Sequence, residues 1–195
     1  MARTLRNLFA LAALCAMAVL TGCASTRVIE SNVQSFTAAT AAVRPASYRF
    51  ERLPSQQAPR QEQLEAMAAQ ALAQVGLTPA TDGKPRYAVE VAAQVLVLQN
   101  PFSYGGSIGF WGYHTGFGMG GWMEPVWYRH GVHLLLRELA TGQVVYETSA
   151  TYDSTAVDSL TLLPVLLQAA LQDYPLPPSG PRKVSIPLTA DTAKP

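Results

Sequence analysis

The sequence predicts an α+β fold in which two helices cover one face of a single mixed or mostly antiparallel sheet. Apolar and polar residues alternate in several short segments, which is the periodicity of half-buried strands. Two other segments repeat their apolar residues at helical spacing, and stretches rich in proline, glycine and polar residues separate the segments. The expected order is β-β-α-β, then a long loop, then β-β-α-β.

The first half of the chain supplies two strands and a helix. Apolar or small residues alternate with charged and amide residues directly after Arg27, which predicts a first strand, and residues 47–53 predict a second. Apolar residues over 64–75 recur at helical spacing, so they form one face of a helix that Gly76 can close. Two prolines and a glycine in 77–85 indicate a loop.

The second half repeats this alternation around one further helix. Asp158 or Ser159 can cap a helix over 163–171, and Pro164 suits its first turn. Residues 140–143 have the composition of a hairpin turn. Further strands are expected over 87–97, 127–139, 144–152 and 184–188.

The N-terminus has the pattern of an export signal. Arg3 and Arg6 are the only charged residues among the first 22, and an uncharged apolar run follows over 8–20. A helix that crosses a bilayer needs about 20 such residues, so this run is too short to span one. A basic start, a short apolar run and small residues after it predict a cleaved signal peptide over 1–22.

The segment Leu20-Thr21-Gly22-Cys23 resembles the lipobox of bacterial lipoproteins. In that class the cysteine sulfur receives a diacylglycerol, the leader is cut before the cysteine, and the acyl chains hold the protein on a membrane. The resemblance therefore implies lipid attachment at Cys23. Ala24 stands where an aspartate commonly signals retention in the inner membrane, so we expect anchoring in the outer membrane with the domain facing the periplasm.

The composition excludes several function classes. Cleavage would leave 173 residues, enough for one domain with a sizeable core. Loss of Arg3 and Arg6 lowers the basic residues from 14 to 12 against 13 acidic ones, a net charge of −1 that argues against nucleic-acid binding. Cys15 leaves with the leader and Cys23 takes the lipid, so no disulfide or cysteine-ligated metal is expected. We expect no cofactor, and the oligomeric state stays open.

Several segments besides the lipobox carry a wider resemblance. They are the strand directly after it, Tyr-Arg-Phe-Glu-Arg at 48–52, Ala-Thr-Gly-Gln-Val-Val-Tyr-Glu at 140–147, and a proline-bearing helix that ends in Asp-Tyr-Pro. With a glycine-aromatic insertion before the hairpin, the chain resembles a family of bacterial lipoproteins defined by an uncharacterised conserved domain. The resemblance implies an exported lipoprotein without an established activity. It favours a single domain over 23–188 and a polar tail over 189–195.

Two catalytic patterns occur in a glycine-rich stretch. Residues 105–109 fit the nucleophile elbow G-x-S-x-G around Ser107, and residues 116–121 fit the dinucleotide fingerprint G-x-G-x-x-G. The elbow needs a helix directly after its serine, and the fingerprint needs one after its glycines. Further glycines follow Ser107 and Pro125 follows the second pattern, so neither helix is expected. We therefore expect no catalytic residue here.

Two histidines are weak candidates for metal ligands. His130 and His133 fall three apart in an expected strand, where such residues point to opposite faces, and no third ligand is evident. We therefore expect exposed or hydrogen-bonded histidines and no metal site. Asp153 and Asp158 lie near the expected start of the second helix, where capping would explain them.

The loop over 102–128 holds nine of the 17 aromatic residues and eight glycines. Three interpretations stay open: the aromatics cover an open sheet face, they contact a partner or a membrane interface, or the loop is partly disordered and adhesive. The candidate interaction residues are Phe102, Tyr104, Phe110, Trp111, Tyr113, Phe117, Trp122 and Trp127.

These features together predict an outer-membrane-anchored lipoprotein that acts as a non-catalytic binding or cell-envelope structural module. The membrane is its expected partner through the lipid on Cys23, and an envelope protein is the expected further partner. The alternative is a periplasmic enzyme of hydrolase type with a site that no motif reveals. A deep pocket with convergent polar groups would favour that alternative.

Overall fold

The computed structural model describes residues 27–38, 44–56, 59–98, 125–157 and 160–188. The helices are α2 (Pro59–Gln74) and α3 (Leu163–Leu171), and a short 3-10 turn, η1, spans Pro54–Gln56. The strands are β1 (Arg27–Thr37), β2 (Ala46–Phe50), β3 (Leu77–Pro79), β4 (Tyr87–Leu98), β5 (Trp127–Glu138), β6 (Val144–Ser154) and β7 (Arg182–Leu188).

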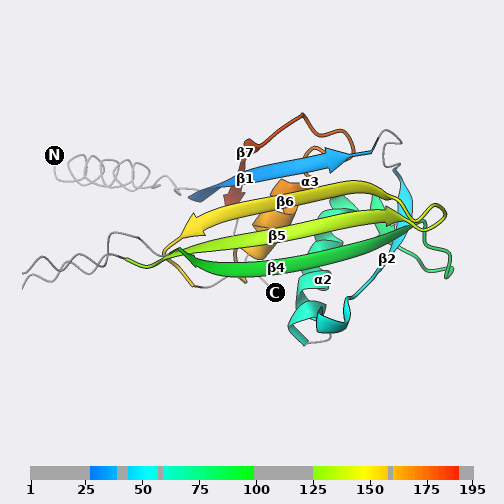
Figure 1. The fold of residues 1–195 in the computed structure, drawn as a ribbon, viewed down its shortest axis with the longest axis horizontal. Helices are drawn as coiled ribbons and strands as arrows, with labels where there is room; N and C mark the ends of the chain where they lie inside the picture. Colours follow the sequence, from blue (N-terminus) through cyan, green and yellow to red (C-terminus); the bar gives the residue numbers. More distant parts are fainter. Residues whose placement is uncertain (1–26, 39–43, 57–58, 99–124, 158–159, 189–195) are drawn as a thin grey trace, which may run out of the picture.

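The described strands form one sheet in the order β3-β2-β4-β5-β6-β1-β7, and both helices lie on the same face of it (Figure 1). In this sheet order, each neighbouring pair in the run β4-β5-β6-β1-β7 is antiparallel, whereas β2 runs parallel to both of its neighbours. The predicted α+β fold with a mixed sheet and two helices on one face is therefore confirmed.

Among the described strands, β3 is the one that the sequence prediction lacks, because residues 77–85 were expected to form a loop. Three residues ending in Pro79 are too few to show the alternation of a strand, and they pair only with β2. The second strand is also shorter than expected: β2 ends at Phe50 instead of reaching Leu53. Its short length leaves most of the neighbouring strand β4 unpaired on that side.

The core lies between the helices and the helix-facing side of the sheet. In β1 the residues from Ile29 to Ser35 alternate between buried and exposed, as the sequence predicts. In α3 seven of the nine residues are buried, because this helix packs against α2 and against the strands β1, β5, β6 and β7. The opposite face of the sheet carries mainly polar side chains, which include ion pairs between Arg137 and Glu90 and between Arg129 and Asp153.

The helix ends match the prediction for α2 and differ for α3. Gly76 has φ of +85°, a left-handed conformation that glycine adopts without strain, and α2 closes just before it. The helix α3 begins at Leu163 after Leu162, which caps it without a side-chain hydrogen bond. The expected cap at residue 158 or 159 is therefore wrong, because a turn over 160–162 separates that position from the helix.

A buried polar cluster holds the C-terminal end of α3. The hydroxyl of Thr148 donates to the carbonyl of Ala170 at 2.8 Å and lies 2.7 Å from the hydroxyl of Ser35. Arg182 donates to Asp173 at 2.6 Å and also contacts Ser35. Because these polar groups satisfy one another and a helix end, the cluster has a structural role.

Candidate functional site

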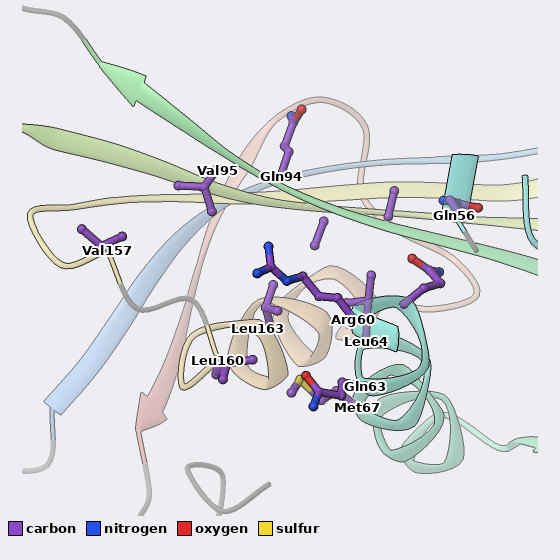
Figure 2. Close-up of a pocket in the computed structure, with 13 residues that line it drawn as sticks. Gln56, Arg60, Gln63, Leu64, Met67, Gln94, Val95, Val157, Leu160 and Leu163 are labelled. Atoms are coloured by element: carbon purple, nitrogen blue, oxygen red, sulfur yellow. The ribbon is translucent and has the colours of Figure 1, made fainter. Parts of the chain in front are cut away.

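A groove lies between the N-terminal part of α2, the far end of β4 and the segment that precedes α3 (Figure 2). Its volume is about 790 Å³, which is within the range of ligand sites. Apolar side chains make one part of the lining: Leu64, Met67, Ala92, Ala93, Val95, Val157, Leu160 and Leu163. Amide and guanidinium side chains make the rest: Gln56, Arg60, Gln61, Gln63 and Gln94.

The sheet edge beside this groove is open. The strand β2 pairs with β4 only from Tyr87 to Val89, and the amide of Glu51 donates to the carbonyl of Val89 at 2.9 Å. No described strand pairs with β4 on that side beyond this point, whereas β5 pairs with β4 on the other side as far as Leu98. Figure 1 shows β4 as the outermost strand over this stretch.

Two glutamines, one in η1 and one in the first turn of α2, bind the carbonyl of Val91 on the unpaired part of β4. The amide nitrogen of Gln61 donates to the carbonyl of Val91 at 2.9 Å, and that of Gln56 donates to the same oxygen at 3.3 Å. The carboxylate of Glu65 accepts two hydrogen bonds from Arg52, at 2.7 and 2.8 Å. These contacts fix the helix N-terminus against the sheet and so define one wall of the groove.

Arg60 supplies the positive charge of the groove. Figure 2 shows its side chain leaving the first turn of α2 and extending into the cavity toward Val95. The two acidic residues of the helix start, Glu62 and Glu65, both pair with Arg52, and no described carboxylate pairs with Arg60. The N-terminal end of a helix adds partial positive charge. The groove therefore favours a ligand that carries a negative group.

One end of the sheet is rich in exposed apolar side chains. The registers place the start of β1, the end of β4, the start of β5 and the end of β6 at this same end. Twelve large apolar side chains are exposed among the described residues, and eight of them lie here. We call this the apolar end, and its exposed side chains are Val28, Val95, Leu96, Val97, Val126, Trp127, Val157 and Leu160.

Most of the candidate residues from the sequence lie outside the described part of the chain. Trp127 is the exception: it is the first residue of β5, pairs with Leu98 and has 47% of its surface exposed. Ser107 also lies outside the described residues. The remaining candidate residues that lie outside the described part of the chain are Cys23, Phe102, Tyr104, Phe110, Trp111, Tyr113, Phe117 and Trp122.

The two histidines point to opposite faces of the sheet, as the strand spacing predicts, so they cannot share a metal ion. The ring of His130 is buried on the helix side, and its Nε2 lies 2.9 Å from the carbonyl of Ala156, to which it donates. The ring of His133 is on the other face, 2.9 Å from the carboxylate of Glu147. Among the described residues no three potential ligands gather at one point.

Asp153 does not cap a helix, contrary to the expectation from the sequence. It lies in β6, not at a helix start, and its carboxylate accepts two hydrogen bonds from Arg129 on the adjacent strand at 2.7 and 2.8 Å. These hydrogen bonds hold the pKa of Asp153 below its usual value. The error arose because β6 continues to Ser154, two residues beyond the expected end of that strand.

Sequence motifs gave no indication of the groove. Its polar lining consists of glutamines and one arginine, which form no recognisable catalytic or binding pattern. The relevant signal is a difference in length: β4 has twelve residues, whereas β2 has five. A long strand beside a short one must leave part of its edge open.

Comparison with known proteins identifies a family. The chain matches a domain of unknown function, DUF4136, over residues 32–176, and no curated protein matches it. No described helix is long and apolar enough to cross a membrane.

Solved structures resemble the fold at low identity. A PelC dodecamer from Paraburkholderia phytofirmans has 16% identity and a TM-score of 0.44, over 72% of this chain and 95% of that one. A PDZ domain protein from Parabacteroides distasonis has 14% identity and a TM-score of 0.47, over 82% of this chain and 39% of that one. The family match covers most of the chain, and the protein belongs to the DUF4136 family.

Proposed function

We propose that this protein is an outer-membrane-anchored, periplasm-facing lipoprotein whose domain is a non-catalytic binding module for an envelope protein. One observation carries the proposal: the exposed apolar side chains gather at the end of the sheet where β1 begins, four residues after Cys23. A lipid at Cys23 and an apolar surface at that end would act on the same membrane.

The distance between anchor and domain supports this arrangement. Four residues span at most about 13–14 Å, so a lipid on Cys23 keeps the start of β1 near the headgroups. Trp127 suits a membrane boundary because an indole has an apolar body and one polar group. Arg27 is exposed at the start of β1, where its charge can meet lipid phosphates.

The groove supports binding in preference to hydrolysis. Its lining contains no serine, cysteine, histidine or carboxylate among the described residues, so it lacks a nucleophile and a general acid or base. Amide and guanidinium side chains beside apolar walls instead suit the recognition of a polypeptide surface. The negative net charge of the mature chain also disfavours nucleic acid as the partner.

Single-cysteine labelling tests the orientation. Cys15 would leave with the leader and Cys23 would be acylated, so Val97→Cys and Thr141→Cys each introduce the only free thiol. Val97 lies at the apolar end, whereas Thr141 is exposed in the hairpin at the opposite end. In vesicles of phosphatidylethanolamine and phosphatidylglycerol, spin-labelled lipids should quench a fluorophore on Val97→Cys and leave one on Thr141→Cys unaffected.

Intact-mass measurement of the protein from membranes tests the anchor separately. We expect diacylglycerol and an acyl chain on Cys23, and an uncleaved, unlipidated precursor from Cys23→Ala. An unmodified wild-type mass would overturn the anchor. Equal quenching at both labelled sites would overturn the orientation, even in a lipidated protein.

A further inference from the structure

We propose that the open edge of β4 binds an extended segment of a partner polypeptide as an added β-strand. The segment would place apolar side chains in the groove and an acidic side chain at Arg60. This inference rests on the proposed function as a binding module, and it names the class of partner: an unpaired, acidic and apolar strand.

The backbone of β4 presents unpaired hydrogen-bonding groups along this edge. The carbonyls of Val89 and Val91 point away from β5, since the first accepts from Glu51 and the second from Gln61. The register between β4 and β5 has no irregularity, so the alternation continues. The amides and carbonyls of Ala93, Val95 and Val97 therefore also point outward.

The open edge of β4 is long enough to pair with a whole added strand. Residues 92–98 extend about 23 Å at roughly 3.3 Å per residue, which is room for a strand of about seven residues. Native sheets usually cover, charge or interrupt an edge of this length, because it attracts other strands. The described part of this edge contains no proline and no charged residue, so nothing in it opposes strand addition.

The side chains of the same strand determine which segments fit. Ala93 and Val95 line the groove, where Leu64 and Leu163 of the two helices face them. A strand added beside β4 would direct every second side chain toward these apolar walls and the others toward the polar face of the sheet. The groove therefore selects a segment with alternating apolar residues.

The charge of the groove adds a second requirement. Arg60 has no described carboxylate partner, and its side chain extends into the cavity beside Val95. An acidic residue on the groove-facing side of the added strand would pair with it. A basic segment would be disfavoured, because the helix start and Arg60 both carry positive charge.

A designed peptide tests the proposal on the lipidated full-length protein in detergent micelles. The acetylated, amidated peptide Ser-Val-Thr-Val-Thr-Asp-Ser-Val has its valines and aspartate on one face, and the aspartate is its only charged group. At millimolar concentration it should slow hydrogen exchange of the amides of Ala93, Val95 and Val97, as measured by NMR. Amides in the hairpin at Thr141 should exchange at an unchanged rate.

Two matched variants separate the backbone contribution from the side chain. Val95→Pro removes an outward amide without removing a hydrogen bond to β5, and proline is tolerated at sheet edges. It should weaken binding by roughly fivefold to tenfold, as loss of one hydrogen bond implies. Arg60→Gln should also weaken binding in low salt, and Lys84→Gln, outside the groove, should not.

The peptide itself provides a control that needs no variant. N-methylation of every residue of the peptide blocks strand pairing in either strand direction and should abolish the protection of the three amides. The proposal is overturned if no protection occurs at millimolar peptide, or if the N-methylated peptide protects the amides equally. Protection without acylation of Cys23 would instead refute the anchor and leave the strand-binding edge in place.

Discussion

The hydroxyl of Tyr48 is buried with no hydrogen-bond partner among the described residues. Its ring packs edge-on against Phe50 at 5.2 Å between centroids, so the apolar part of the side chain is well placed. A buried polar group without a partner costs about 1–3 kcal/mol, and the phenylalanine side chain has the same shape without that cost. Tyr48→Phe should therefore raise the free energy of unfolding by about 1 kcal/mol. Urea unfolding at pH 8 measures this change, and a destabilised variant would show that the hydroxyl has a partner.

The same burial makes stability depend on alkaline pH. Desolvation raises the pKa of Tyr48 to about 12, and that of Tyr174 is also raised by burial. Both phenols are neutral in the folded and unfolded states at neutral pH, so the free energy of unfolding does not depend on pH through them there. Above about pH 10 the unfolded phenols ionise first, so the free energy of unfolding should fall as pH rises from 10 to 12. The fall should be smaller in Tyr48→Phe, and an equal slope in both proteins would contradict this assignment.

Residue-level prediction from the sequence succeeded where one local rule decided the outcome. The opposite orientations of His130 and His133 follow from strand periodicity alone. Asp153 was misinterpreted because its partner, Arg129, lies on another strand, and no local pattern reports that pairing. The groove residue Arg60 was missed for the same reason: its environment depends on Arg52, which takes the nearby carboxylates.

At the scale of elements, β4 and β5 are adjacent antiparallel strands, so the chain between them needs only to connect two neighbouring strand ends. The two strands stay in register from Tyr87 and Glu138 to Leu98 and Trp127. Alternation in the sequence predicted both strands, but it could not predict β3, whose three residues depend on pairing with β2. It also could not predict that β4 extends past β2, because pairing partners are set by the tertiary fold.

This register suggests an excision experiment. Replacing Phe102–Met123 with Asn-Gly should leave a folded domain, since antiparallel neighbours need only a short connection. The thermal transition should stay cooperative and lie within a few degrees of that of the parent chain. Differential scanning calorimetry makes the comparison. Aggregation or loss of the transition would mean that the excised aromatics belong to the core, because each buried ring removes about 150–250 Å² from water.

At the scale of the whole molecule, exposed apolar surface is unevenly distributed. Eight of the twelve exposed large apolar side chains of the described residues lie at the apolar end. Single exposed apolar residues are common on soluble proteins, whereas a cluster of this kind is where the proposed membrane contact would lie. Sequence periodicity could not predict the cluster. Val95 and Val97 follow the alternation of a core-facing strand, and they are exposed because they lie beyond the cover of the helices.

In the absence of lipid or detergent, we expect the domain to associate through this surface. A chain that starts at residue 24 should show concentration-dependent self-association in sedimentation velocity, and detergent should reverse it. Val97→Lys should make the chain monomeric. Phe36→Lys changes a similarly exposed residue at the other end of β1 and should leave association unchanged. Equal behaviour of the two variants would contradict a specific role for the apolar end.

The position of β1 also has a mechanical consequence. This strand comes directly after the proposed anchor, and it pairs with β7 over residues 27–33 and with β6 over residues 32–37. A pull on the lipid is therefore directed along the strand, at right angles to hydrogen bonds that run across it. Under such shear the bonds of both ladders share the load and cannot open one after another. Tension between the proposed anchor and a partner bound at β4 would pass along β1 into β6, and both ladders would resist it in shear.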